Sequence, residues 1–156
     1  MKILVTGSAG FIGFHVCKKL IEKGNTVIGI DNLNKYYDQN LKKARLKILH
    51  NITKSKKKRF IFFKTDISNR HKIKKIFSKF KFDKVLHFAA QAGVRYSLKN
   101  PSEYIKSNQI GFFNIIDLSK IYKTKHFIYA SSSSVYGDNS KLPFSENSNT
   151  DQPRQI

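Results

Sequence analysis

The feature that most restricts the fold of this chain is a regular alternation of short apolar runs with longer stretches of helical periodicity. Short runs rich in Ile, Val and Phe are typical of buried parallel strands. They occupy residues 2–6, 26–30, 59–64, 84–88 and 126–130. The helical stretches between them cover residues 11–23, 36–51, 69–80 and 102–122. Strands that alternate with helices at this spacing predict a doubly wound α/β fold, in which helices cover both faces of a parallel sheet.

The helical periodicity also predicts which side chains face the sheet. Ile12 belongs to the inward set of the first helix. In the second helix, the side chains expected to face the sheet are those of Leu41, Ala44, Leu46, Ile48 and Leu49. In the third helix, they are those of Ile73, Ile76, Phe77 and Phe80. We expect the last helix to begin with Ser102 as its N-cap, because Pro101 comes directly before it.

Three glycines follow the first apolar run: Gly7, Gly10 and Gly13, in a G-x-x-G-x-x-G spacing. In a nucleotide-binding turn one glycine forms the bend, one lets the backbone approach a pyrophosphate, and one lets helix and strand pack closely. The phosphates then lie at the helix N-terminus, where free N–H groups favour negative charge. Turns of other kinds also need glycine, so the trio alone does not decide the ligand.

Asp31 ends the second apolar run, eighteen residues after Gly13. Dinucleotide-binding folds place an acidic residue at about this distance, where it binds the adenosine ribose hydroxyls. A carboxylate at that position repels a 2′-phosphate, so the sequence predicts NAD rather than NADP as the cofactor. The alternative is that Asp31 only caps the turn formed by residues 32–34.

The chain carries thirty Lys and Arg against ten Asp and Glu, a formal net charge of +20. Clustered cations would indicate a nucleic-acid partner, but these lysines are spread over nearly every segment. Only residues 54–59 form a cluster, and a solvated loop between two elements is its simpler interpretation. We therefore expect no specific nucleic-acid binding.

Cys17 is the only cysteine, which excludes an intrachain disulfide and favours a reducing compartment. No apolar run reaches the roughly 18 residues that a membrane span requires, and glycines interrupt the opening segment too early for a signal peptide. The five histidines have no metal-ligand spacing. The sequence predicts a cytoplasmic protein with no metal site and no membrane association.

Six segments carry information beyond these spacing rules: TGSAGFIG, DNLNKYYD, TDI, HFAAQAGVRYS, SNQIGFFNII and YASSSSVYG. In this order the chain resembles the extended short-chain dehydrogenase/reductase family, in its NAD-dependent nucleotide-sugar epimerase/dehydratase branch. Within that branch it is most similar to the UDP-glucuronate 4-epimerases, up to about Asp151. The resemblance implies a Rossmann-type sheet that binds NAD, a UDP-sugar substrate and, for the complete protein, a homodimer.

The resemblance also implies roles for individual residues. Asp31 and Asn32 would hold the adenosine ribose. Asp66 and Ile67 would flank the adenine, with Asp66 accepting a hydrogen bond from its exocyclic amine. Further residues expected along the cofactor are Phe11 and Ile12 at the pyrophosphate turn, Phe88, Ala89 and Ala90 after the fourth strand, and Asn108 on the long helix. By its position alone, Asn108 would be a polar residue on a helix surface.

The serine run after the fifth strand is the expected substrate side. By the resemblance, Ser132 is catalytic and binds the reacting sugar hydroxyl, while Ser133 and Ser134 bind the sugar carboxylate. Ligands of open α/β sheets bind at the carboxyl ends of strands, although a serine run is also an ordinary turn. Arg95, expected in the loop after the fourth strand, is a candidate partner for an anionic substrate or a surface arginine. His87 is expected to be structural.

The family mechanism needs a tyrosine base and a lysine four residues later that lowers its pKa. No Tyr-x-x-x-Lys follows the serine run in this sequence. We therefore expect residues 1–156 to form a truncated NAD-binding domain, with the first five strands of the sheet and no activity by itself. Its fifth strand would be an uncovered apolar edge that favours self-association.

For the complete protein, the resemblance implies conversion of UDP-glucuronate to UDP-galacturonate for surface polysaccharide, by C4 oxidation and re-reduction with NAD. Nucleotide-sugar dehydratases and decarboxylases share this cofactor half. They usually carry an acidic residue near the position of Ser134, which this chain lacks. An inactive NAD-binding fragment and a nucleic-acid binder are the alternatives from other functional classes.

Overall fold

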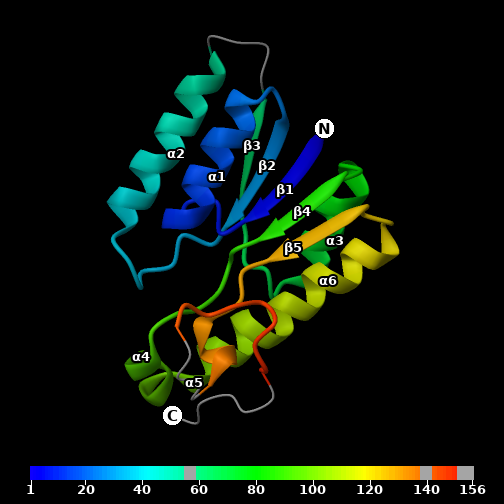
Figure 1. The fold of residues 1–156 in the computed structure, drawn as a ribbon. Helices are drawn as coiled ribbons and strands as arrows, with labels where there is room; N and C mark the ends of the chain where they lie inside the picture. Colours follow the sequence, from blue (N-terminus) through cyan, green and yellow to red (C-terminus); the bar gives the residue numbers. More distant parts are fainter. Residues whose placement is uncertain (55–58, 138–141, 151–156) are drawn as a thin grey trace.

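The computed structural model describes residues 1–54, 59–137 and 142–150. Five strands form one sheet in the order β3-β2-β1-β4-β5 (Figure 1). They are β1 (Lys2–Thr6), β2 (Thr26–Asp31), β3 (Phe60–Lys64), β4 (Lys84–His87) and β5 (His126–Tyr129). Each pair of neighbouring strands is parallel. The predicted Rossmann-type, doubly wound fold is confirmed.

The order of the strands reverses at β1, which lies between β2 and β4. Thr6 at the end of β1 pairs with Ile30 on one side and with His87 on the other. The carboxyl ends of the three strands therefore lie at the same edge of the sheet. In open α/β sheets, ligands bind in the crevice at this kind of switch point.

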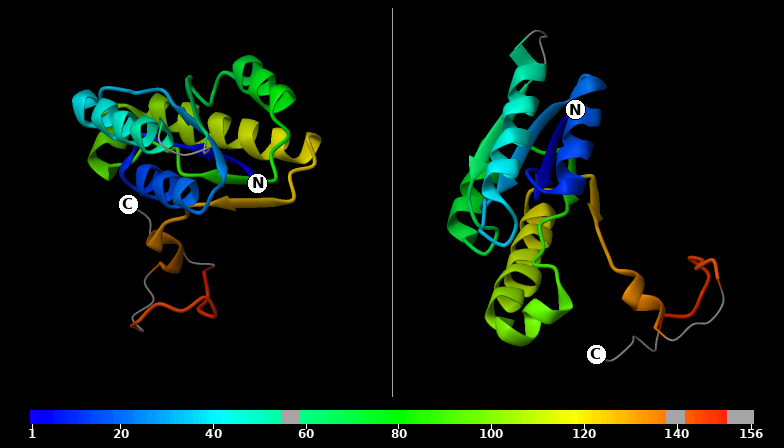
Figure 2. Two further views of the ribbon diagram at one scale, coloured as in Figure 1. Left: turned by 90° about the horizontal axis from the view of Figure 1, so that it is seen from above. Right: turned by 90° about the vertical axis from the view of Figure 1, so that its left-hand side faces the viewer.

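Helices cover both faces of the sheet (Figure 2). One face carries α1 (Phe11–Glu22) and α2 (Gln39–Lys54), and the other carries α3 (Arg70–Lys79) and α6 (Phe112–Ile121). Two apolar clusters fill the space between the layers. Cys17, Ile21 and Leu49 belong to the cluster under α1 and α2, whereas Phe77 and Leu118 belong to the cluster under α3 and α6.

The helix expected at 102–122 is present as three consecutive segments, and a further short helix comes before it. The chain forms α4 (Val94–Lys99), α5 (Pro101–Tyr104), a π-helical segment η1 (Ile105–Gly111), and then α6. Asn100 is the N-cap residue of α5, and Pro101 occupies the first helical position, where its missing N–H costs no hydrogen bond. The predicted Ser102 cap is therefore wrong, and α4 has no counterpart in the sequence prediction.

Some side chains predicted to face inward are exposed. In α2, Leu46 and Leu49 are buried as expected, but Leu41 and Ile48 are exposed and Lys42 is buried. The buried face of this helix therefore consists of Lys42, Leu46 and Leu49 and includes a charged residue. Further predicted residues that are exposed are Ala44 in α2 and Ile12 in α1.

The predicted inward face of α3 is confirmed. Ile73, Ile76 and Phe77 are buried, and Phe80 packs against their cluster. Asn69 caps this helix, because its side-chain oxygen accepts a hydrogen bond from the backbone N–H of Lys72 at 3.0 Å.

Within the described sheet, β5 is an edge strand that pairs with β4 alone. Ile128 and Tyr129 are 40% and 54% exposed, which agrees with the predicted apolar edge. The chain then forms a short 3-10 helix, η2 (Ser133–Tyr136), in a segment that lies apart from the sheet and helices (Figure 2).

The basic cluster at 54–59 falls largely outside the described residues, as do residues 151–156. Among the helices that the structure describes, none is long and apolar enough to cross a membrane. The described residues also hold no group of three or more His, Cys, Asp or Glu that could bind a metal ion.

Candidate functional site

A cavity lies at the switch point, where β1, β2 and β4 end. Many of the predicted cofactor residues line it: Gly7, Gly10, Phe11, Ile12, Gly13, Asp31, Asn32, Ile67, Phe88, Ala89 and Ala90. Its wall also contains residues that the sequence reasoning missed: Ile30, Asn34, Tyr36, Tyr37, Lys42, Thr65, Gln91, Ala92 and Ser107. Asp66, Asn108, Arg95 and the three predicted serines are not part of this wall.

The glycine turn between β1 and α1 is closely packed on two sides. Gly7 has a φ of +68°, and a Cβ there would lie 2.8 Å from the backbone nitrogen of Ala89. A Cβ on Gly13 would lie 2.1 Å from the carbonyl oxygen of Gly7. Gly7 therefore lets the turn approach the segment after β4, and Gly13 lets α1 approach the turn.

The N-terminus of α1 faces the same cavity. Gly10, its N-cap residue, provides no side-chain hydrogen bond, and the first turn contains no acidic residue. Gly10, Phe11 and Ile12 line the cavity, with Phe11 and Ile12 exposed. Uncapped N–H groups and the helix dipole favour an anionic group such as a pyrophosphate at this position.

Asp31 joins the end of β2 to the glycine turn. It is buried, and one carboxylate oxygen accepts a hydrogen bond from the backbone N–H of Ala9 at 3.1 Å. The other oxygen accepts one from the N–H of Leu33 at 2.8 Å. Asp31 therefore shapes the local turn, as the alternative interpretation proposed, and also presents a carboxylate in the cavity wall.

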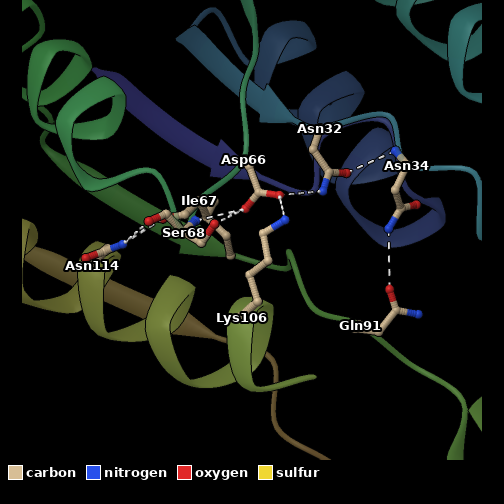
Figure 3. Close-up of polar contacts among 8 residues, drawn as sticks. All are labelled: Asn32, Asn34, Asp66, Ile67, Ser68, Gln91, Lys106 and Asn114. Carbon is tan, nitrogen blue, oxygen red and sulfur yellow. Dashed lines mark hydrogen bonds and ion pairs between the residues drawn. The ribbon is translucent and has the colours of Figure 1, made fainter. Parts of the chain in front are cut away.

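Asp66 lies behind the cavity wall in a polar network (Figure 3). One of its oxygens accepts from the Ser68 N–H at 2.9 Å and the Ser68 hydroxyl at 2.7 Å. The other accepts from Asn32 Nδ2 at 3.2 Å and lies 3.5 Å from the Lys106 ammonium. Burial by itself raises the pKa of Asp66, but these hydrogen bonds and the charge of Lys106 outweigh it and lower the pKa.

Lys42 brings a buried positive charge to the cavity. Its ammonium donates hydrogen bonds to the backbone oxygen and the side-chain oxygen of Asn34, at 3.0 and 2.7 Å. Burial lowers the pKa of Lys42, while the Asp31 carboxylate acts in the opposite direction. Nearby, Arg45 donates to the carbonyl oxygen of Ala9 at 3.2 Å. Two cations therefore stand beside the glycine turn and Asp31.

Thr6 and His87 support the segment that lines the cavity after β4. The Thr6 hydroxyl accepts from the N–H groups of Phe88 and Ala89, both at 3.2 Å, and lies 2.8 Å from Nδ1 of His87. Because two N–H groups already use the hydroxyl as an acceptor, its own proton is the one shared with Nδ1. His87 is then neutral and carries its ring proton on Nε2. Burial lowers the pKa of His87 to about 4, in agreement with the predicted structural role.

Asn108 acts on the same segment from the helix side. Its side-chain oxygen accepts from the N–H of Gln91 at 2.8 Å, and its amide donates to the carbonyl oxygen of Gln91 at 3.0 Å. Gln91 is buried, and its side-chain oxygen accepts from Asn34 Nδ2 at 3.4 Å (Figure 3). Asn108 thus holds the backbone of a cavity residue, and its predicted proximity to the cofactor stays a prediction.

The predicted substrate residues lie away from this cavity. Ser132, Ser133 and Ser134 are exposed, and Ser132 caps η2 by accepting from the N–H of Ser134 at 3.2 Å. This is the ordinary turn role that was the alternative for the serine run. Arg95 is exposed on α4, so its predicted place in a loop is wrong. Their roles toward a substrate stay predictions.

The chemistry of the cavity fits a dinucleotide. It combines a glycine turn that excludes side chains, an uncapped helix N-terminus, and an acidic residue near the turn. A family profile described as GDP-mannose 4,6 dehydratase matches residues 4–155. The chain belongs to this family. The family match begins within β1 and includes all of β2, β3, β4 and β5.

Individual relatives agree with the family match. Protein CapI of Staphylococcus aureus is 48% identical over 156 residues, which is 100% of this chain and 45% of the relative. UDP-glucuronate 4-epimerase 4 of Arabidopsis thaliana is 44% identical over 155 residues, 99% of this chain and 34% of the relative. The chain therefore spans less than half the length of these relatives.

A solved structure of a similar enzyme agrees as well. The UDP-glucuronic acid 4-epimerase of Bacillus cereus, in complex with NAD, superimposes with a TM-score of 0.76 at 35% identity. The match covers 90% of this chain and 42% of that one. The chain is thus related to sugar-nucleotide 4-epimerases over its described fold.

Proposed function

We propose that this chain supplies the NAD-binding domain of a nucleotide-sugar 4-epimerase whose substrate is UDP-glucuronate. The observation that carries the proposal is the position of Asp31, a buried carboxylate in the cavity wall that is bonded to the glycine turn through Ala9. A carboxylate there suits free ribose hydroxyls and disfavours a 2′-phosphate. The names of the Arabidopsis and Bacillus relatives support the substrate and the cofactor.

Different residues would bind different parts of the dinucleotide. The glycine turn and the N-terminus of α1 would hold the pyrophosphate, and Asp31 would orient the adenosine ribose. Thr6 holds the Phe88–Ala89 backbone in the wall. When bound, NAD supplies a hydride acceptor and donor next to the sugar. Ser132 would donate to or accept from the reacting sugar hydroxyl, and we assign this role to the complete protein.

Dehydration of a nucleotide sugar is the second candidate, because the matching family is described as GDP-mannose 4,6 dehydratase. Epimerisation is favoured by the names of the Arabidopsis and Bacillus relatives and by the uncharged residue at Ser134. The full-length protein should convert UDP-glucuronate to UDP-galacturonate, with the products identified by NMR. A 4-keto-6-deoxy product from GDP-mannose would identify a dehydratase instead.

The cofactor choice can be tested on this chain with Asp31→Asn. The change keeps the size of the side chain but removes the charge and one of the two oxygens that accept from Ala9 and Leu33. Hydrogen bonds to charged groups contribute about 1.5–3 kcal/mol, and the shift in preference between NAD and NADP separates the effect on the ribose from the effect on the turn. We expect NAD affinity measured by calorimetry to fall about tenfold or more, and the preference for NAD over NADP to shrink. Asp38→Asn, an exposed aspartate in the same loop, should change neither. Equal NAD affinity in wild type and Asp31→Asn would contradict the proposal.

Two further properties belong to this proposal for the complete protein. A homodimer through the long helices is supported by the exposed apolar side chains on η1 and α6: Ile105, Ile110, Phe113 and Ile116. A cytoplasmic location is supported by Cys17, the single cysteine of this chain, because a buried and unpaired cysteine is typical of a reducing compartment. A role in surface polysaccharide synthesis belongs to the proposal only through the proposed substrate. Sedimentation of the full-length protein would test the dimer.

A further inference from the structure

Two loops that border the cavity meet through tyrosine rings. Tyr36 and Tyr37, in the loop between β2 and α2, both line the cavity. The Tyr36 ring lies 4.6 Å from Tyr37 and 4.7 Å from Tyr96 on α4, between ring centroids. Tyr96 in turn lies 6.4 Å from Tyr104 on α5. We call these four residues the tyrosine cluster. It joins the loop after β2 to the helices that follow β4.

Gly93 is the backbone position on which Tyr36 of this cluster packs, and we call this contact the seating of Tyr36. It has a φ of +100°, and a Cβ on it would lie 2.1 Å from the hydroxyl oxygen of Tyr36. Its carbonyl oxygen accepts hydrogen bonds from the Tyr104 hydroxyl and from the N–H of Tyr96. The backbone of Gly93 is therefore held in place by α4 and α5, and Tyr36 occupies the space that a larger residue would need.

A polar bridge runs parallel to the tyrosine cluster. Asn34, two residues before Tyr36, accepts from the Lys42 ammonium and donates to Gln91. Gln91 is held through its backbone by Asn108. Figure 3 shows the Asn34 and Gln91 side chains pointing toward one another across the gap between the two loops. The loop after β2 is thus attached to the segment after β4 at two neighbouring points.

We propose that Tyr36, seated on Gly93, fastens the β2–α2 loop across the mouth of the cavity and sets the rate at which a bound dinucleotide leaves. This inference rests on the proposed cofactor. Of the predicted ribose ligands, Asp31 is the last residue of β2 and Asn32 is the first residue of this loop, so loosening Tyr36 loosens the chain that carries Asn32 and adjoins Asp31. Tyr36 and Gly93 are positioning residues, since they act through the loop.

The two residues offer a rescue experiment. Gly93→Ala places a methyl group where the Tyr36 hydroxyl lies and forces the loop away. Tyr36→Phe removes the hydroxyl but keeps the ring, and the next ring atom lies 3.2 Å from the new Cβ. The double variant should therefore restore the contact. Gly24→Ala is the matched control, because Gly24 also has a left-handed φ, +83°, with nothing within 4 Å of a Cβ.

The first readout needs no cofactor. Hydrogen–deuterium exchange of the chain should be faster at residues 32–38 in Gly93→Ala, and close to wild type in the double variant and in Gly24→Ala. The second readout is the release of NAD, followed by stopped-flow displacement of a fluorescent etheno-adenine analogue. We expect Gly93→Ala to release it about tenfold faster, which corresponds to about 1.4 kcal/mol, and the double variant to return to the wild-type rate.

The outcomes separate the two proposals. Unchanged exchange and release in Gly93→Ala would overturn the fastening role of Tyr36. A double variant that stays as fast as Gly93→Ala would also overturn it, because backbone strain at Gly93 rather than the contact would then be the cause. If the exchange responds as expected in a chain that binds no NAD, the cofactor proposal fails together with the role in release, while the seating of Tyr36 on Gly93 stands.

Discussion

At the scale of single residues, the wall of the cavity depends on buried polar groups that do not touch its interior. Thr6 is completely buried, and its hydroxyl is shared by two N–H groups and by His87. Aromatic rings of Phe112 and Phe127 cover the imidazole, with centroids at 5.5 and 6.4 Å. A buried polar pair such as Thr6 and His87 stabilises the fold only while each of its hydrogen bonds is made, because an unpaired polar group is costly in a low dielectric.

His87 should therefore make the stability of the chain depend on pH. Its pKa in the folded chain is about 4, below its usual 6.5, so the unfolded chain binds the proton more readily. The contribution of neutral His87 to the free energy of unfolding is fully present above pH 6.5 and is lost as the pH falls toward 4. The total loss is about 3 kcal/mol.

His87→Gln replaces the imidazole with a neutral polar side chain that does not titrate. In urea unfolding at several pH values, the variant should lose less stability than wild type between about pH 6.5 and about pH 4. His126→Gln, at an exposed position of β5, serves as the control and should follow wild type. Parallel curves for wild type and His87→Gln would rule out a buried neutral imidazole.

The role of the Thr6 hydroxyl can be tested with two conservative substitutions, Thr6→Val and Thr6→Ser. Thr6→Val keeps the shape but removes the acceptor for two N–H groups and the donor for His87, which should cost about 1–3 kcal/mol. It should also weaken NAD binding, because Phe88 and Ala89 belong to the cavity wall. Thr6→Ser keeps the hydroxyl and should retain most of both properties. Equal losses for Val and Ser would mean that the methyl group, not the hydrogen bonds, is decisive.

At the scale of elements, the glycine turn is a contact between α1, β1 and the segment after β4. Gly13 is needed because of close approach rather than an unusual backbone conformation, since a Cβ would meet the backbone of Gly7 and of Ser8. Gly10 is less crowded, with its nearest atom at 3.1 Å. Glycine is thus required to different degrees, and for different physical reasons, at different positions of the same motif.

We expect Gly13→Ala to destabilise the chain by about 1–3 kcal/mol, the usual cost of overpacking, and to weaken NAD binding as α1 moves away. Gly10→Ala in the same turn should cost less. Urea unfolding and calorimetry on both variants would measure these effects. A larger loss of stability in Gly10→Ala than in Gly13→Ala would contradict the assignment.

At the scale of the whole molecule, the described sheet has an open side at β5. Ile128 and Tyr129 are exposed on this edge strand, and unpaired strand edges promote association between chains. A charged side chain on such an edge is a common protection against it.

Ile128→Lys should therefore reduce self-association of this chain at high concentration, measured by light scattering. Ile48→Lys, which adds the same charge at an exposed position of α2, is the control for net charge alone and should have a smaller effect. If both variants reduce scattering equally, the edge of β5 is not the main contact.

The alternation of apolar runs and amphipathic stretches by itself determined the parallel sheet, its strands to within one residue, and the position of the glycine turn and Asp31. These features follow from local periodicity and backbone restrictions, which a sequence displays directly. The quoted segments also led to seven further residues of the cavity wall: Phe11, Ile12, Asn32, Ile67, Phe88, Ala89 and Ala90. They did so through resemblance, since no spacing rule points to Phe88 or Ile67.

Only the tertiary structure decided which polar residues turn toward the cavity. Lys42 is one of thirty basic residues, and its burial is hinted at only by its spacing from Leu46 and Leu49. The contact of Tyr36 with Gly93 joins segments more than fifty residues apart in sequence. Such contacts depend on how two loops meet after the sheet has formed, and local periodicity carries no information about that meeting.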